Sequence, residues 1–212
     1  MKSLFRVIPF AICVGLTLGF CGCSNDNQTN SSEASSTPAT YFDGSETHPI
    51  EASSVLSALS SGAMDIQYES EDDTLKTITV NLGMSSDSLK ELLPEDAVSR
   101  SENESYIHFS TGMARIYFTN DDSPNGIVAI VQFGDAFGFS PTITTKQAVT
   151  GVMGTPESEG ELEPEAASAF LFGASGATYV SYSSSDNTVR FIFTPDGYLQ
   201  ATTISKQGLW IY

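Results

Sequence analysis

Basic side chains are scarce in this chain of 212 residues, which has 9 Lys and Arg against 26 Asp and Glu. With histidine neutral, the formal charge at pH 7 is −17. A surface this acidic repels the phosphates of nucleic acids and the headgroups of anionic lipids. The charge balance therefore argues against nucleic acid as a partner and against a basic patch that binds membranes.

Cysteine and histidine, which supply most zinc ligands, are also rare. The three cysteines are Cys13, Cys21 and Cys23, so the chain after residue 23 can form neither a disulfide nor a thiolate metal site. The two histidines, His48 and His108, lie far apart in the sequence and lack metal-ligand spacing. We therefore expect no metal and no cofactor.

A long apolar run occurs only at the N-terminus. Lys2 and Arg6 precede an apolar stretch over residues 7–20, and a polar segment begins at Ser24. This stretch is shorter than the roughly 20 residues that a transmembrane helix needs, but it suits the apolar core of a signal peptide. The sequence predicts a signal peptide over residues 1–22, and a membrane-spanning helix is the alternative interpretation.

The end of this segment, Phe20-Cys21-Gly22-Cys23, resembles the lipobox of bacterial lipoproteins, in which a small residue precedes the lipidated cysteine. The resemblance implies that Gly22 is that small residue and that Cys23 carries the lipid and becomes the mature N-terminus. It also implies that the lipid on Cys23 holds the chain on the extracytoplasmic side of a membrane in the cell envelope.

Residues 23–48 are rich in Ser, Thr, Asn and acidic side chains and poor in apolar ones. Such a segment buries too little apolar surface to offset the entropy lost on ordering. We predict that it is a disordered tether between the lipid and a folded body.

The pattern of residues 49–212 predicts an α+β fold of short helices and antiparallel strands. Apolar residues at helical spacing predict a helix over residues 50–59, and Ser85 and Thr145 stand as N-caps before two more helices. Short apolar or alternating runs predict strands over residues 64–68, 75–80, 106–109, 113–119, 127–133, 169–172, 178–182, 188–194 and 198–204.

Two parts of this body repeat each other. The N-caps Ser85 and Thr145 are 60 residues apart. The run Arg115–Thr119 (RIYFT) matches Arg190–Thr194 (RFIFT), and each leads into an Asn-Gly or Asp-Gly turn. The repetition predicts two tandem helix-plus-antiparallel-sheet units, over residues 49–138 and 139–212.

This order resembles the tandem units of β-lactamase inhibitor protein and the single unit of the SmpA/OmlA outer-membrane lipoproteins. In those families a helical segment with a G-x-[ST] start and a G-x-P end precedes a sheet. Gly83-Met84-Ser85 matches the start in the first unit, and Gly154-Thr155-Pro156 matches the end in the second. The resemblance implies an inhibitor-protein-like (BLIP-like) tandem fold and a role in binding another protein, without naming the target.

Strand alternation divides the residues of the sheet between two faces. In each of two strands, two apolar residues alternate with an arginine, and these four residues are assigned to one face, in a core packed under helices, namely Ile116, Phe118, Phe191 and Phe193. The opposite face is expected to be open and to have the composition of a protein-binding surface. Its candidate binding residues are Tyr106, His108, Arg115, Tyr117 and Arg190.

The remaining motifs point to no catalytic machinery. Residues 121–126 (DDSPNG) place oxygen atoms as a calcium loop does, but Gln132 stands where that loop needs Glu, so a hairpin turn is the other interpretation. Ser185-Asp186-Asn187 copies one motif of penicillin-binding enzymes without its companion motifs. We therefore predict that the chain is not an enzyme.

Together these features predict an exported, lipid-anchored binding module whose partner is an envelope or secreted protein. Capture of a small ligand or peptide for uptake or sensing is the alternative function. An envelope hydrolase is the third hypothesis.

Overall fold

The computed structural model describes residues 40–42, 47–49, 52–70, 74–102, 106–119, 126–171 and 175–210. The predicted signal peptide, the lipidation residue Cys23 and most of the predicted tether lie outside these ranges. Inside the last part of that tether, two short strands, β1 (Thr40–Phe42) and β2 (Thr47–Pro49), pair antiparallel.

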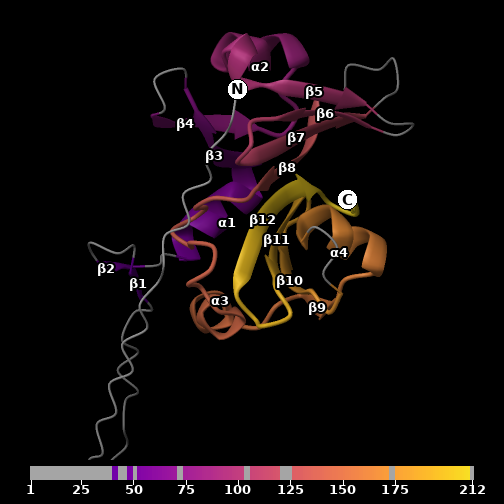
Figure 1. Cartoon of the computed structure of the whole chain (residues 1–212). Coiled ribbons are helices and arrows are strands. Elements are labelled where there is room, and N and C mark those ends of the chain that lie inside the picture. Colours follow the sequence, from indigo (N-terminus) through magenta and orange to yellow (C-terminus); the bar gives the residue numbers. More distant parts are fainter. Residues whose placement is uncertain are drawn as a thin grey trace, which may run out of the picture. The chain divides into compact units, whose positions relative to one another are not determined.

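The protein has an α+β fold dominated by one antiparallel sheet of eight strands (Figure 1). The strand order is β5-β6-β7-β8-β12-β11-β10-β9. Two runs of four consecutive strands therefore meet where β8 pairs with β12. The strands are β5 (Ser99–Glu102), β6 (Tyr106–Ser110), β7 (Ala114–Thr119), β8 (Ile127–Gln132), β9 (Ser158–Glu161), β10 (Thr178–Ser183), β11 (Asn187–Phe193) and β12 (Leu199–Lys206).

Three helices and a hairpin pack on one face of this sheet, which we call the first face. The helices are α1 (Ala52–Ser61), α2 (Ser86–Leu92) and α3 (Lys146–Met153), and the hairpin pairs β3 (Ala63–Glu69) with β4 (Leu75–Asn81). A single turn of 3-10 helix, η1 (Glu95–Ala97), follows α2.

The first face forms the main apolar core, as strand alternation predicts. The four assigned residues Ile116, Phe118, Phe191 and Phe193 are all buried in one cluster. Val55 of α1, Leu89 of α2 and Val149 of α3 belong to the same cluster and are almost completely buried. The prediction of a helix-packed core is confirmed.

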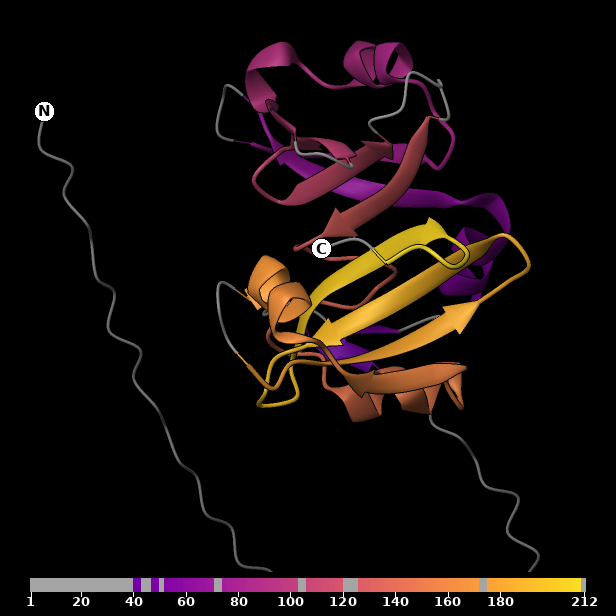
Figure 2. The ribbon, with the colours of Figure 1, turned by 90° about the vertical axis from the view of Figure 1, so that its right-hand side faces the viewer.

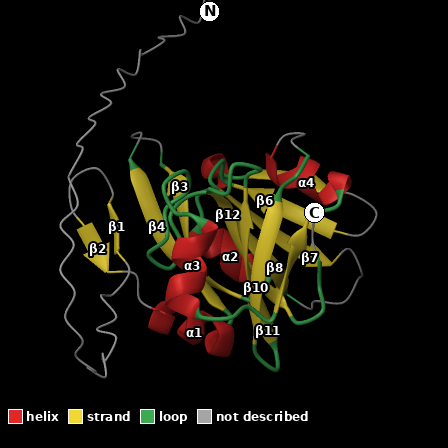
Figure 3. Cartoon of the chain, turned by 90° about the horizontal axis from the view of Figure 1, so that it is seen from below, coloured by secondary structure: helices red, strands yellow, loops and turns green. Residues whose placement is uncertain are grey.

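The second face is not open over its middle, where a fourth helix, α4 (Pro164–Leu171), covers it. Ala166, Ala167 and Phe170 of α4 are buried in a second apolar cluster with Val131 of β8 and Ile192 of β11. Figure 2 shows α4 in front of the sheet, and Figure 3 shows it apart from the other three helices. The prediction of an open face is wrong for this part of the sheet.

The segment that forms α4 was expected to contain a strand over residues 169–172, and this prediction is also wrong. The helix begins at Pro164, a position where proline is favourable because the first helical N–H needs no partner. Alanine, the strongest helix former, then fills three of the next positions. These local preferences outweigh the short apolar run over residues 169–172, from which the strand is predicted.

The two edges of the sheet carry different side chains. At one edge, β9 presents exposed Glu159 and Glu161. At the other edge, β5 presents exposed Ser99 and Arg100.

The predicted N-caps are confirmed. Ser85 Oγ accepts a hydrogen bond from the backbone N–H of Ser88 at 3.1 Å, and this bond begins α2. Thr145 Oγ1 accepts one from the N–H of Ala148 at 3.2 Å and begins α3. A hydroxyl at this position satisfies a backbone donor that the helix itself leaves unpaired.

The loop before α2 is held against the start of β8 by backbone hydrogen bonds. The N–H of Gly83 donates to the carbonyl of Ile127 at 2.7 Å, and the N–H of Ile127 donates to the carbonyl of Met84 at 2.9 Å. Gly126 has a φ of +68°, and a Cβ atom at this residue would collide with the carbonyl oxygen of Gly83. This close approach fixes α2 relative to the sheet.

We expect Gly126→Ala to destabilise the protein more than Gly197→Ala. Both residues have positive φ, which costs a residue with a side chain about 1–2 kcal/mol. Only Gly126 adds a collision with backbone, which costs a further ~1–3 kcal/mol, because no atom lies within 4 Å of a Cβ at Gly197. Urea unfolding of both variants measures the difference, and equal losses would contradict the close approach.

Candidate binding site

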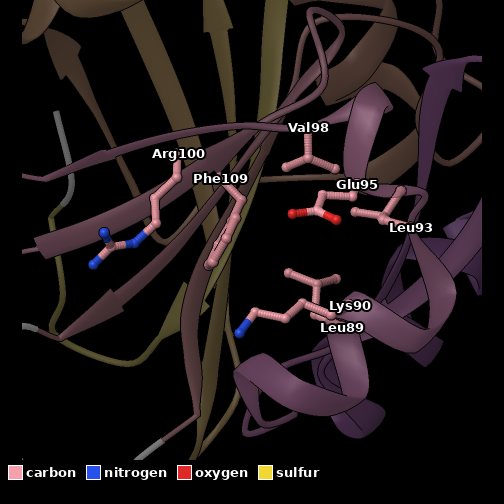
Figure 4. Close-up of a pocket in the computed structure, with 7 residues that line it drawn as sticks. All are labelled: Leu89, Lys90, Leu93, Glu95, Val98, Arg100 and Phe109. Carbon is pink, nitrogen blue, oxygen red and sulfur yellow. The ribbon is translucent and has the colours of Figure 1, made fainter.

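A groove lies between α2 and the edge of the sheet at β5 and β6, with a volume of about 430 Å³. Figure 4 shows its seven lining side chains around an open space. Its apolar surface comes from Leu89, Leu93, Val98 and Phe109, and its charged groups come from Lys90, Glu95 and Arg100. A volume of this size falls in the range of small-molecule sites.

The local sequence explains why α2 contributes both an apolar wall and a charge. Leu89 and Leu93 are four residues apart, so they lie on the same side of the helix and are buried against the first face. Lys90 follows Leu89 and is exposed at the rim. The N–H of Leu93 donates to the carbonyl of Leu89 at 3.0 Å, and Pro94 then directs the chain into η1 and β5.

The opposite wall of the groove is formed by β5 and β6. Arg100 and Phe109 are direct partners in the β5–β6 register and both line the groove. Phe109 is nearly buried, and its ring packs edge-on against Phe118 with centroids 5.5 Å apart. The groove floor is therefore continuous with the main core.

The charge of Lys90 at the rim is weakly compensated. Lys90 Nζ lies 3.6 Å from a carboxylate oxygen of Asp87, and both side chains are well exposed. An exposed ion pair of this kind on a helix contributes only about 0.3–0.5 kcal/mol, so a bound anion could compete for the ammonium. In a chain of net charge −17, such a local cation beside an apolar wall is unusual.

The second face of the sheet carries the residues that the sequence predicts to bind. Across neighbouring strands, Arg115 pairs with Val131, Val131 with Thr203, and Thr203 with Arg190. Arg115 and Arg190 thus stand in one row, three strand spacings or about 14 Å apart. The sequence prediction that they share a face is confirmed.

Arg115 remains partly exposed on this face. Its guanidinium lies 5.1 Å from the centre of the Phe133 ring. It also donates a hydrogen bond to the hydroxyl of Tyr117, which is buried. Burial raises the pKa of Tyr117, and the hydrogen bond and charge of Arg115 act in the opposite direction.

Arg190 is buried, contrary to its predicted place on an open surface. It is only 7% exposed, because α4 and the chain after β12 cover this part of the sheet. The indole of Trp210 lies over its guanidinium, with 4.1 Å between Cζ and the ring centre. Neither Arg190 nor the buried Tyr117 can contact a large protein surface directly.

The other predicted site residues are only partly described. The backbone of β6 pairs Tyr106 with Thr119 and His108 with Tyr117, and the side chains of Tyr106 and His108 lie outside the described part. Cys23 and residues 121–125 of the candidate calcium loop also lie outside it.

Sequence reasoning missed the groove and the cover over Arg190. Leu89 and Leu93 stand at helical spacing in the sequence. That spacing predicts that both residues are buried, but it does not predict a groove beside them. The sequence Ser99–Glu102 of β5 has no apolar alternation, so nothing marked it as a strand. Trp210 follows the last strand, and its contact with Arg190 depends on a turn at Gly208.

Within the described residues, no group of three or more His, Cys, Asp and Glu side chains is placed to hold a metal ion. No helix in the same ranges is both long enough and apolar enough to cross a membrane.

No family model, no curated protein and no solved structure matches this chain.

The buried Tyr117 predicts a loss of stability at alkaline pH. Its folded pKa is raised above the ordinary value of 10.0, so this contribution to stability is complete below pH 10 and is lost as the pH rises further. As the pH rises from about 9 to about 11, we expect the stability of the Tyr117→Phe variant to fall less than that of the wild type. Thermal unfolding across this range measures it, with Tyr198→Phe at an exposed position as the control. An identical pH slope for the Tyr117→Phe variant and the wild type would contradict the prediction.

Proposed function

We propose that this chain is an exported lipoprotein without catalytic activity, held at a membrane through Cys23, which binds an extended peptide segment of another envelope or secreted protein. The observation that carries the proposal is the groove between α2 and the edge strand β5. An edge strand next to a helix is a geometry in which peptides add to a sheet as a further strand. Main-chain hydrogen bonds then give affinity, and the groove selects one side chain.

The groove determines the chemistry of the segment that fits. Leu89, Leu93, Val98 and Phe109 suit a large apolar side chain. The exposed ammonium of Lys90 at the rim suits a carboxylate close to that side chain. We therefore propose a partner segment that pairs an apolar residue with a neighbouring acidic residue.

The arrangement of the chain supports the tandem, BLIP-like interpretation of the fold within this proposal. In each half, a short helix capped by Ser85 or Thr145 precedes four strands that pair in sequence order. The strands β7 and β11, which carry the repeated runs Arg115–Thr119 and Arg190–Thr194, are each third in their set. The two halves differ in α4, which follows β9 and has no counterpart between β5 and β6 among the described residues.

A small amphiphilic ligand is the second candidate for the groove. The groove has a volume of about 430 Å³, which suits a molecule with an apolar body and one anionic group. Such a ligand would use the same Lys90, but it would need no hydrogen bonds from the edge of β5.

The peptide proposal predicts a charge-dependent selection. A random peptide library is selected against the full-length protein in detergent, and we expect enrichment of short sequences with an apolar residue beside Asp or Glu. Lys90→Glu reverses the charge at the rim and is expected to weaken the selected peptides at least tenfold. Lys76→Glu makes the same change at an exposed position of β4 outside the groove and should leave binding unchanged.

Two results would contradict the peptide proposal. One is the absence of any enriched sequence, and the other is an equal loss of binding in both charge variants. Stabilisation by small anionic amphiphiles that disappears in Lys90→Glu, without peptide enrichment, would favour the second candidate.

The membrane attachment is tested separately. We expect the wild-type chain, expressed in a bacterium, to incorporate labelled fatty acid and to partition into the detergent phase. Cys23→Ser should abolish both properties, whereas Cys21→Ser should retain them, because the lipobox resemblance assigns the lipid to Cys23 alone. Labelling that survives Cys23→Ser would exclude this residue as the attachment site.

A further inference from the structure

Among the described residues, Arg190 is a buried cation without a counterion. Its side chain is 7% exposed on the second face of the sheet. Nη1 donates to Ser205 Oγ at 3.0 Å, and Nε has no hydrogen-bond partner. No carboxylate in the described part of the chain lies within ion-pair distance of it, although the chain has 26 acidic residues.

The contacts of Arg190 do not fully offset the loss of its hydration. Removing a cation from water is unfavourable unless a partner of opposite charge or a full set of acceptors replaces the water. Arg190 has one hydroxyl and the face of one indole, which compensate only part of that cost. Desolvation lowers the pKa of Arg190, and Tyr179 acts against this shift.

The surroundings of Arg190 are mostly apolar and nearly filled. A cavity of about 10 Å³ beside it is lined by Val131, Phe170, Ile192, Thr203 and Trp210, among others. This space holds no more than about one water molecule. Any larger ligand must take the place of a side chain.

Trp210 is the side chain that can be replaced. It is 38% exposed and follows a turn at Gly208, outside the strands of the sheet. Its ring contacts Arg190 on one side and packs edge-on against Tyr179, with centroids 4.8 Å apart. These are side-chain contacts, which a ligand offering a stronger interaction with Arg190 can exchange for its own.

We propose that Arg190 is the recognition residue of a binding site for a carboxylate attached to an apolar body, and that this ligand displaces the Trp210 indole. The carboxylate oxygens accept hydrogen bonds from Nε and from the guanidinium N–H groups. The apolar body rests on Val131, Phe170 and Ile192 in place of the indole. The site shares no residue with the groove beside α2, so it stands independently of the proposed peptide function.

A carboxylate fits this site better than a phosphate. The planar guanidinium matches the two oxygens of a carboxylate, and one negative charge balances one buried cation. A phosphate carries about two charges and needs more donors than the apolar lining supplies. Arg115, in the same row of the sheet, already bonds to Tyr117 and is partly exposed, so it serves as the matched control.

The test uses the single tryptophan of the chain as a reporter. Hexanoate, hexanol and inorganic phosphate are titrated into the full-length protein at constant ionic strength. Of these three compounds, we expect only hexanoate to change the fluorescence of Trp210 in a saturable way and to raise the Tm of the protein. Acetyl-Ala-Ala-Leu with a free or an amidated C-terminus distinguishes a small acid from a polypeptide terminus as the source of the carboxylate.

The variants separate recognition from folding. Arg190→Met removes the buried charge and keeps a similar side-chain volume, so the variant should fold. It should bind hexanoate at least tenfold more weakly than the wild type. Arg115→Met should bind as the wild type does. Trp210→Ala removes the cover and should bind more tightly, as measured by the rise in Tm.

Three outcomes would overturn the carboxylate site. They are an equal response to hexanol or phosphate, an undiminished response in Arg190→Met, and no response from either the wild type or Trp210→Ala to any of the carboxylates.

Discussion

The pairing of β8 with β12 is the contact on which the rest of the structure depends. It runs from Gln132 opposite Thr202 to Ala129 opposite Ser205, and it turns two runs of four strands into one sheet. Because helices cover both faces near this junction, every residue of β8 and of β11 is buried. Strands covered on both sides offer no surface to a partner. Binding sites must then lie at the margin of the sheet or under a cover that can be removed.

The pattern of alternation in the sequence was enough to predict the two faces of the sheet. Ile116 and Phe191 lie in the main core, and Arg115 and Arg190 lie together on the opposite face. Strand alternation shows only to which face of the sheet each side chain points, so it could not show what covers that face. The second face is covered by α4, and the apolar run over residues 169–172 predicts a strand there although Pro164 and the alanines favour a helix.

The candidate sites were harder to predict because each depends on contacts between distant segments. Leu89 was visible as part of an apolar helix stripe, but the space beside it exists because backbone bonds from Gly83 and Met84 to Ile127 fix α2 beside the sheet. Arg190 was expected at the surface, and its burial requires Trp210, which is 20 residues later in the chain. Local sequence patterns carry no information about contacts between segments that are this far apart in the chain.

The unequal edges of the sheet also limit how copies of this protein can associate. The edge strand β5 has the sequence Ser-Arg-Ser-Glu, of which Ser99 and Arg100 are exposed, whereas β9 presents the exposed carboxylates Glu159 and Glu161. Two copies that meet through β9 repel each other, because like charges on facing strands destabilise the pair. Pairing of two copies through this edge is therefore disfavoured, and a strand from another molecule is expected to add at β5.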